Sequence, residues 1–205
     1  MLRKLLSIAV VPMPQVVKRL VYRRVFGWDI ADDVVIGLSW IDVEQVVLAP
    51  GVRIGHFNMI KGARRFEIGR NSYMKNFNQF LGPGLHDHHF PTCTFVMGAE
   101  SRIMSRHFFD LSGDIVIADD VNVGGRDSQL WSHSRFTRSG ERLLAPKTLT
   151  VESGVYIGAR ATLVHCTIPR GAVVGAGAVV TRSLEIDHVG DVIAGNPAVV
   201  IKRGG

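Results

Sequence analysis

The chain has 205 residues, of which 46% are hydrophobic, enough for one domain with a continuous core. Its formal net charge is +6, from 24 basic and 18 acidic side chains. Six of the basic residues precede the first acidic residue, Asp29, so the remaining 18 balance the 18 acidic ones. A nucleic-acid-binding protein gathers basic residues on its binding face. The distribution here therefore argues against that class.

Residues 1–28 form a basic N-terminal arm in which the sequence predicts an amphipathic helix, opened by Pro14. One arc of its helical wheel carries Val16, Val17, Leu20, Val21 and Val25, and the other carries Lys18, Arg19, Tyr22 and Arg23. No apolar stretch reaches the roughly 18 residues of a membrane span. The arm has two interpretations. It is either a peripheral contact with the anionic inner face of a membrane, or a helix that caps the following domain or packs in an oligomer.

From residue 29 to 186, an aliphatic residue recurs at every sixth position. The clearest examples are Val151 and Ile157, then Ile168 and Val174. This period is neither that of a helix nor that of a plain strand, and it is typical of a parallel β-helix in which each hexad supplies one strand and one corner. The hexads begin at Ile30, Ile36, Asp42; Leu48, Ile54, Ile60; Ile68, Met74, Phe80; Met97, Ile103, Phe109; Ile117, Val123, Gln129; Val151, Ile157, Leu163; and Ile168, Val174, Val180. Grouped in threes, they predict an all-β fold of about seven coils.

The insertions between hexads support this grouping. They follow the third hexad of a coil: the pair Phe66 and Glu67, residues 86–96, the pair Ile115 and Val116, and residues 135–150. All four would therefore lie at one corner of the prism. Asp42 and Gln129 break the aliphatic rule, and residues 187–205 form a tail.

Cys93 and Cys166 are too few for a disulfide framework, which fits a protein of the reducing cytoplasm. We expect Cys166, inside a coil, to be a small buried hydrophobic residue.

The main candidate site lies where the repeat breaks. His133 is at a corner, at the root of the insertion 135–150 and close to Trp131. Loops that project from a rigid scaffold are where functional sites are commonly built. His107 is the alternative, and Asp110, three residues later, is placed to orient its imidazole across a turn.

The other long insertion contains His86, His88 and His89, a density that suggests a metal site. Strand-like alternation, however, puts His86 and His88 on one side and His89 on the other. We therefore expect this loop to line an acceptor pocket or an interface, and we expect no metal requirement.

The hexads from Ile30 to Val180, the His before a long loop, and the ending Val179-Val-Thr-Arg-Ser and Ala194-Gly-Asn-Pro-Ala resemble those of the hexapeptide-repeat acyltransferases. The resemblance is greatest to their sugar O-acetyltransferase branch, which includes maltose and colanic-acid acetyltransferases. It implies a left-handed β-helix, a homotrimer, acetyl-CoA or another acyl-CoA as co-substrate, and a sugar or glycan acceptor of the kind used in polysaccharide biosynthesis. It also implies that His133 is the general base, with His107 as the alternative base or a substrate contact.

The same resemblance implies a donor site. Its residues would be Ala159 and Ala176, along which pantetheine would lie, Thr181 and Arg182 at the nucleotide end, and Lys202 and Arg203 at the CoA phosphates. Trp131, His86 and His88 would contact the acceptor.

Two other functions share this fold pattern. A γ-class carbonic anhydrase-like metal lyase would need a pair of His four residues apart near one corner, and the sequence has none. A non-enzymatic assembly scaffold would need neither His133 nor its long loop.

Overall fold

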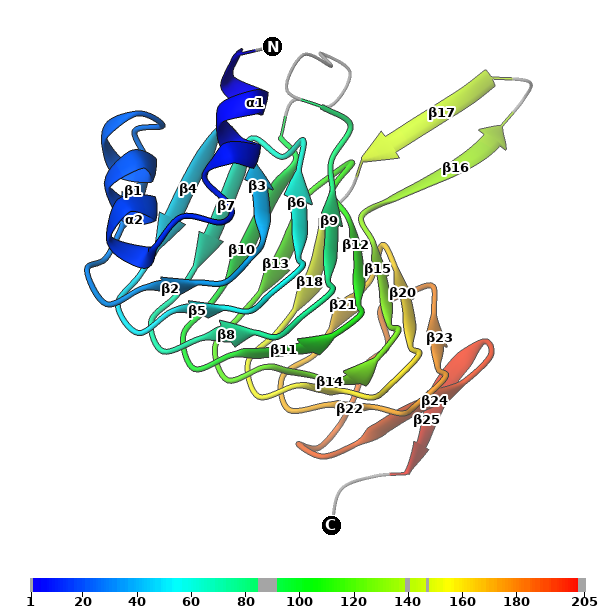
Figure 1. Cartoon of the computed structure of the whole chain (residues 1–205). Coiled ribbons are helices and arrows are strands. Elements are labelled where there is room, and N and C mark those ends of the chain that lie inside the picture. Colours follow the sequence, from blue (N-terminus) through cyan, green and yellow to red (C-terminus); the bar gives the residue numbers. More distant parts are fainter. Residues whose placement is uncertain (1, 85–91, 139–140, 147, 203–205) are drawn as a thin grey trace.

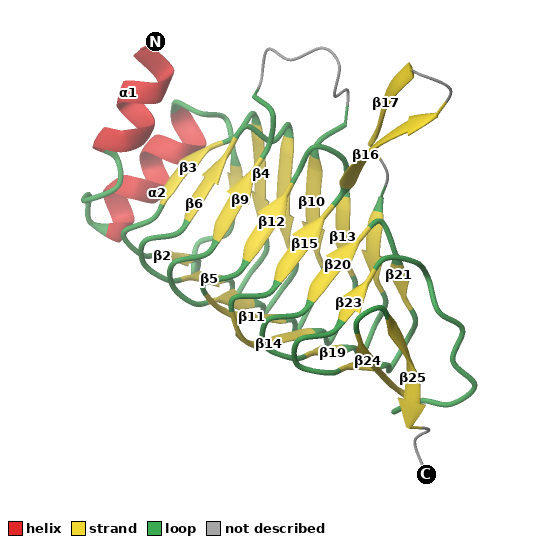
Figure 2. Cartoon of the chain, turned by 90° about the vertical axis from the view of Figure 1, so that its right-hand side faces the viewer, coloured by secondary structure: helices red, strands yellow, loops and turns green. Residues whose placement is uncertain are grey.

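The computed structural model describes residues 2–84, 92–138, 141–146 and 148–202. The chain winds into a left-handed parallel β-helix, a prism with one parallel sheet on each of its three sides (Figure 1). Two helices lie at the N-terminal end, and a β-hairpin projects from the side (Figure 2). The predicted seven coils are confirmed.

Each sheet takes one strand from every coil. Sheet A comprises β1 (Asp29–Ile30), β4 (Gln45–Leu48), β7 (Arg65–Ile68), β10 (Thr94–Met97), β13 (Ile115–Ile117), β18 (Leu149–Val151) and β21 (Thr167–Ile168). Sheet B comprises β2 (Val35–Ile36), β5 (Arg53–Ile54), β8 (Tyr73–Met74), β11 (Arg102–Ser105), β14 (Asn122–Arg126), β19 (Tyr156–Ile157), β22 (Val173–Val174), β24 (Val192–Gly195) and β25 (Ala198–Lys202). Sheet C comprises β3 (Trp40–Asp42), β6 (Met59–Lys61), β9 (Gln79–Leu81), β12 (Phe108–Asp110), β15 (Gln129–Trp131), β20 (Thr162–Val164) and β23 (Val179–Val180).

The register confirms the predicted hexads in sheets A and B and corrects two of them in sheet C. The strand pairs place Ile41 opposite Ile60 and Leu130 opposite Leu163, and both residues are fully buried. The predicted hexad starts, Asp42 and Gln129, were therefore wrong by one residue each. Both lie outside the core, and the inward residue of every strand in sheet C is apolar.

Each error arises at the corner between sheets B and C. In the first coil this corner is one residue shorter than in the second, so the inward position falls on Ile41. In the fifth coil β14 carries a bulge, because Ile103 pairs with Val123 while Ser105 pairs with Arg126. The bulge needs glycine, since Gly125 has a φ of 64° and an added Cβ would lie 2.5 Å from that of Ala159.

In the third and fourth coils, four Phe side chains from sheets A and C fill the core of the prism. Phe80 stacks on Phe109 with ring centroids 4.2 Å apart, and Phe66 stacks on Phe95 at 4.9 Å. The two stacks meet edge to face, for example between Phe80 and Phe95 at 4.8 Å. All four side chains are fully buried.

Helices α1 (Leu2–Ala9) and α2 (Gln15–Arg24) cover the open end of the first coil. Helix α2 turns its polar arc inward. Lys18 and Tyr22 are buried, and the Lys18 ammonium donates to the carbonyls of Ile36 and Gly37 at 3.0 and 2.9 Å. These contacts supply donors to carbonyls at the end of the stack. The capping interpretation of the arm thus describes how α2 meets the β-helix.

Both long insertions lie between sheets C and A, as predicted. The second one forms an antiparallel hairpin of β16 (His133–Arg138) and β17 (Glu141–Pro146). After the seventh coil, β24 extends sheet B and β25 pairs antiparallel with it. No helix in the described part of the chain is long and apolar enough to span a membrane.

Candidate functional site

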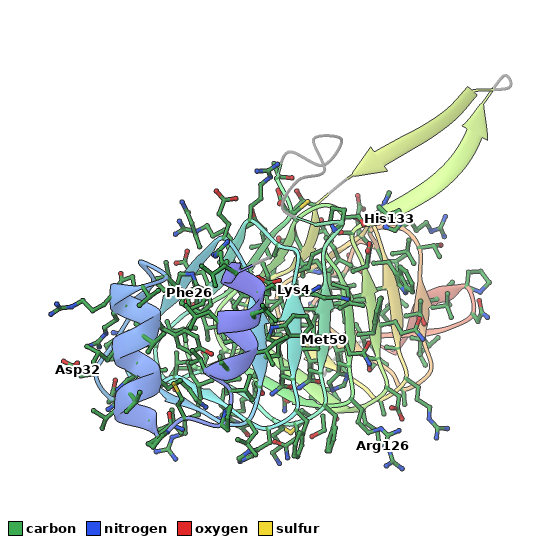
Figure 3. The ribbon with its side chains drawn as sticks, turned by 45° about the horizontal axis from the view of Figure 1, so that its top comes forward. Lys4, Phe26, Asp32, Met59, Arg126 and His133 are labelled. Atoms are coloured by element: carbon green, nitrogen blue, oxygen red, sulfur yellow. The ribbon has the colours of Figure 1, made fainter. Side chains whose placement is uncertain are left out.

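The site is built around a contact between Asp110 and His133, which come from consecutive coils. Asp110 ends β12 and points outward from sheet C, and His133 begins the hairpin two residues after β15 ends (Figure 3). The Nδ1 atom of His133 makes a short contact with Oδ2 of Asp110. Since a carboxylate accepts, the neutral imidazole that pairs with it carries its proton on Nδ1 and its lone pair on Nε2. The side chain of His133 is 27% exposed, so this Nε2 side borders solvent.

Two serines hold this pair in place. Ser112 donates to Oδ1 of Asp110 at 2.9 Å, so each oxygen of the carboxylate has a partner. Buried Ser132, next to His133, donates to the main-chain carbonyl of Asp110 at 2.6 Å and accepts from Gly113 N at 2.7 Å. The orientation of the imidazole is therefore fixed by the corner itself.

An aromatic surface continues from His133 over the outer face of sheet C. Trp131 lies 6.3 Å from the His133 ring, centroid to centroid, and 5.0 Å from Phe108 on the preceding coil. Its indole N–H donates to Gln129 Oε1. A pocket of about 410 Å³ follows beyond Phe108, lined by Phe77, Gln79, Arg106, His107, Phe108 and Asp127.

His107 plays a different part, in a ladder of polar side chains inside the corner between sheets B and C. The ladder runs through Ser39, Asn58, Asn78, His107 and Ser128. The main-chain N–H of His107 donates to Asn78 Oδ1, and its Nδ1 accepts from Ser128 N at 3.2 Å. The ring is 1% exposed, and among the described residues its Nε2 has no hydrogen-bond partner. The expected contact with Asp110 is not formed, because that carboxylate binds His133.

Burial lowers the pKa of His107 to about 4. In the unfolded chain it would be about 6.5, so the unfolded state binds more protons between these values. Folding stability should thus fall by about 3 kcal/mol through this group as the pH drops from 7 to 4. His107→Asn should remove that loss, because Asn at this rung can accept from Ser128 N as Asn58 and Asn78 accept from their neighbours. Urea unfolding at both pH values measures it.

The exposed His188 provides the control for this prediction. His188→Asn should keep the wild-type pH dependence. If the stability of His107→Asn fell between pH 7 and pH 4 as much as that of the wild type, the prediction for His107 would be contradicted.

Four of the residues predicted for the donor lie at the two ends of the last strands of sheet C. Ala159 is half-buried and Ala176 exposed at successive corners between sheets B and C. Thr181 and Arg182 are exposed just after β23. Lys202 ends β25, whereas Arg203 falls outside the described residues.

The predicted acceptor contacts His86 and His88 also fall outside the described residues. In the part of the chain that is described, no group of three His, Cys, Asp or Glu side chains is arranged to hold a metal ion. Burial raises the pKa of the Cys166 thiol to about 12, as suits a core residue.

Solved structures define the class of fold. An N-acyltransferase from Bacillus cereus, a mutant of AntD in complex with dTDP-4-amino-4,6-dideoxyglucose and coenzyme A, matches 77% of this chain and 83% of its own, with a TM-score of 0.56 and 16% identity. A UDP-N-acetylglucosamine acyltransferase matches 84% of this chain and 68% of its own, with a TM-score of 0.54 and 16% identity. The protein therefore has the left-handed β-helix fold of the hexapeptide-repeat acyltransferases. No protein-family model and no curated protein matches its sequence.

Sequence reasoning singled out Asp110, Trp131 and His133 but missed Phe108, Ser112 and Ser132. The signal that would have joined them is the register of sheet C, in which Asp110 lies opposite Trp131. Assigning Gln129 to the core shifted the fifth coil by one residue and hid that neighbourhood.

Proposed function

We propose that the protein is a CoA-dependent O-acyltransferase that moves an acetyl group from acetyl-CoA to a hydroxyl of a sugar or glycan precursor. The observation that carries this proposal is the Asp110–His133 pair, held at the root of the hairpin with Nε2 of His133 facing outward. This is the arrangement of a general base oriented by a carboxylate.

In the proposed reaction, Nε2 of His133 takes the proton of the acceptor hydroxyl as its oxygen attacks the thioester carbonyl. The new C–O bond forms and the C–S bond breaks when the tetrahedral intermediate collapses. The CoA sulfur leaves and takes the proton back from the imidazolium. Asp110 stabilises that transient cation and holds the tautomer.

The surroundings of the pair support a sugar as acceptor. Trp131 and Phe108 offer apolar ring faces, and the adjoining pocket adds polar groups from Gln79, Arg106 and Asp127. Ring faces combined with a few directed polar groups suit a ligand that has both C–H faces and hydroxyls. This chemistry agrees with the sugar O-acetyltransferase branch named by the sequence resemblance and with a role in polysaccharide biosynthesis.

For the donor we propose the predicted set of Ala159, Ala176, Thr181 and Arg182, with Lys202 and Arg203 near the CoA phosphates. A homotrimer, in which a neighbouring prism closes the CoA groove, completes the proposal. The cytoplasm is the expected location. The likeness to acyltransferases supports the CoA chemistry, and one of these was solved with coenzyme A bound.

The test is release of the CoA thiol from acetyl-CoA with a panel of neutral sugars, amino sugars and nucleotide sugars, beside a calorimetric measurement of acetyl-CoA binding. Turnover with a hydroxyl acceptor, giving an alkali-labile ester, is the expected result. If the product were instead an alkali-stable amide, formed only with amino sugars, the reaction would be N-acyl transfer rather than O-acyl transfer. A protein that binds no acetyl-CoA and turns over no acceptor would instead be a scaffold.

A further inference from the structure

Helix α2 is oriented opposite to a usual surface helix, with most of its polar side chains inward and most of its apolar ones outward. The inward side chains of α2 bind main-chain carbonyls of the first coil. Besides Lys18, Arg19 donates to Val34 O at 3.1 Å and Arg23 to Ile30 O at 2.6 Å. Gln15 exchanges hydrogen bonds with both the N–H and the carbonyl of Ile36. Because these contacts fix the rotation of α2, its apolar arc must face outward.

That outward arc is strongly exposed. On α2, Val16 is 71% exposed and Leu20 is 55% exposed, and Val25, just after the helix, is 62% exposed. Helix α1 shows the same pattern in part. Its Ser7 is buried, while its apolar residues Leu2, Leu5 and Ile8 are exposed. We refer to Leu2, Leu5, Ile8, Val16, Val17, Leu20 and Val25 as the apolar cap. Exposed apolar residues gathered in this way mark a binding surface.

A groove joins the two helices. It has a volume of about 470 Å³ and is lined by Leu2, Arg3, Leu6, Val25, Phe26 and Glu44. Leu2 on α1 and Val25 after α2 thus border the same hollow. Phe26 lies beside α1 in Figure 3, and the Arg3 guanidinium lies over its ring. The cap therefore has apolar ridges, and the groove between them is lined by four apolar residues together with Arg3 and Glu44.

The segment that carries the cap is basic, and the acidic residue that lines the groove, Glu44, lies 3.7 Å from the Arg64 guanidinium. Residues 1–28 hold six basic side chains and no acidic one. Lys4 and Arg24 are exposed. The nearby Asp32 is paired with Arg23 at 2.7 Å, which lowers the pKa of that carboxyl. A second copy docked on this face would bring two basic surfaces together, whereas an anionic surface would complement them.

We propose that the apolar cap docks the protein end-on onto an anionic lipid bilayer. The apolar side chains of α1 and α2 enter the boundary between headgroups and acyl chains, and the exposed Lys4 and Arg24 side chains meet the lipid phosphates. The cap lies at the N-terminal end of the prism, four coils away from the site. This inference is therefore independent of the proposed acyl transfer. His133, in the fifth coil, would stand about 19 Å from the first coil, at four strand spacings of about 4.8 Å.

Flotation of the full chain with lipid vesicles tests this proposal. Vesicles of phosphatidylcholine alone are compared with vesicles containing about a third phosphatidylglycerol, each at low and at physiological salt. The variant Leu5→Gln with Leu20→Gln removes two exposed cap residues, and Gln is a good helix former. The matched control is Val189→Gln with Val199→Gln, which removes one exposed residue just before β24 and one in β25, two strands at the other end of the prism (Figure 2).

The wild type and the control are expected to bind anionic vesicles. Binding should be at least tenfold weaker for the cap variant on these vesicles, and for the wild type on vesicles of phosphatidylcholine alone. Equal binding by the cap variant, or no binding of the wild type to any vesicle, would overturn the proposal. Light scattering after gel filtration completes the test. If the wild type binds no vesicle and the cap variant has half the particle mass of the wild type without lipid, the cap is instead a contact between copies.

Discussion

Replacing His133 by Gln is expected to lower kcat for acetyl transfer by about 10²–10⁴ and to leave the KM for acetyl-CoA nearly unchanged. Gln can still donate to Asp110 and fill the same space, but it cannot take the proton of the acceptor hydroxyl. The loss should therefore appear in the chemical step rather than in donor binding. Initial rates of thiol release, measured with the acceptor that the wild type uses, give both constants.

Two variants make this result specific. His56→Gln changes an exposed His in the second coil and should keep wild-type rates. Asp110→Asn should fall between the wild type and His133→Gln, because the base remains while its tautomer and counter-charge are no longer fixed. If His133→Gln retained wild-type kcat, His133 would not be the base and the site would have to be sought elsewhere.

Truncation of Phe109 is expected to produce the largest loss of stability. Phe109→Ala should reduce the free energy of unfolding by about 3–5 kcal/mol, because it removes a fully buried ring and leaves a cavity between rigid coils. Phe109 stacks on Phe80 and meets Phe95 edge to face at 5.6 Å. The surrounding strands are tied to their neighbours on both sides, so they cannot collapse into the space.

Urea unfolding at a fixed protein concentration measures the effect, since association would shift the apparent stability. Phe108→Ala is the matched control. Its ring lies on the outer face of sheet C against Trp131, so its loss should cost far less. A Phe109→Ala variant within about 1 kcal/mol of the wild type would contradict the view that this cluster is the centre of the core.

The hexad period was enough to predict the fold, because one inward aliphatic residue per strand is what a stack of short parallel strands requires. It placed Ile30, Leu48 and Ile68 correctly above one another in sheet A. It also put both long insertions at one corner. The two misplaced residues, Asp42 and Gln129, follow corners of unusual length, and a fixed period cannot register a residue lost or added there.

The functional arrangement depended on contacts between coils. Asp110 and His133 are 23 positions apart, and the one-residue bulge in β14 shifts the register of the fifth coil, in which Asp110 lies opposite Trp131, two residues before His133. Nothing in the local sequence indicates that His107 is instead held inside a polar ladder. The two rings lie at different corners, His107 inside the one between sheets B and C and His133 at the one between sheets C and A.

The sequence by itself determined the coil number, the core composition, the corner that bears the insertions and the amphipathic pattern of the N-terminal arm. Only the tertiary structure decided which arc of α2 faces inward, because the carbonyls at the end of the first coil need donors more than the core needs further apolar area. It likewise decided which His meets Asp110, since that contact depends on the stacking offset between two coils rather than on spacing along the chain.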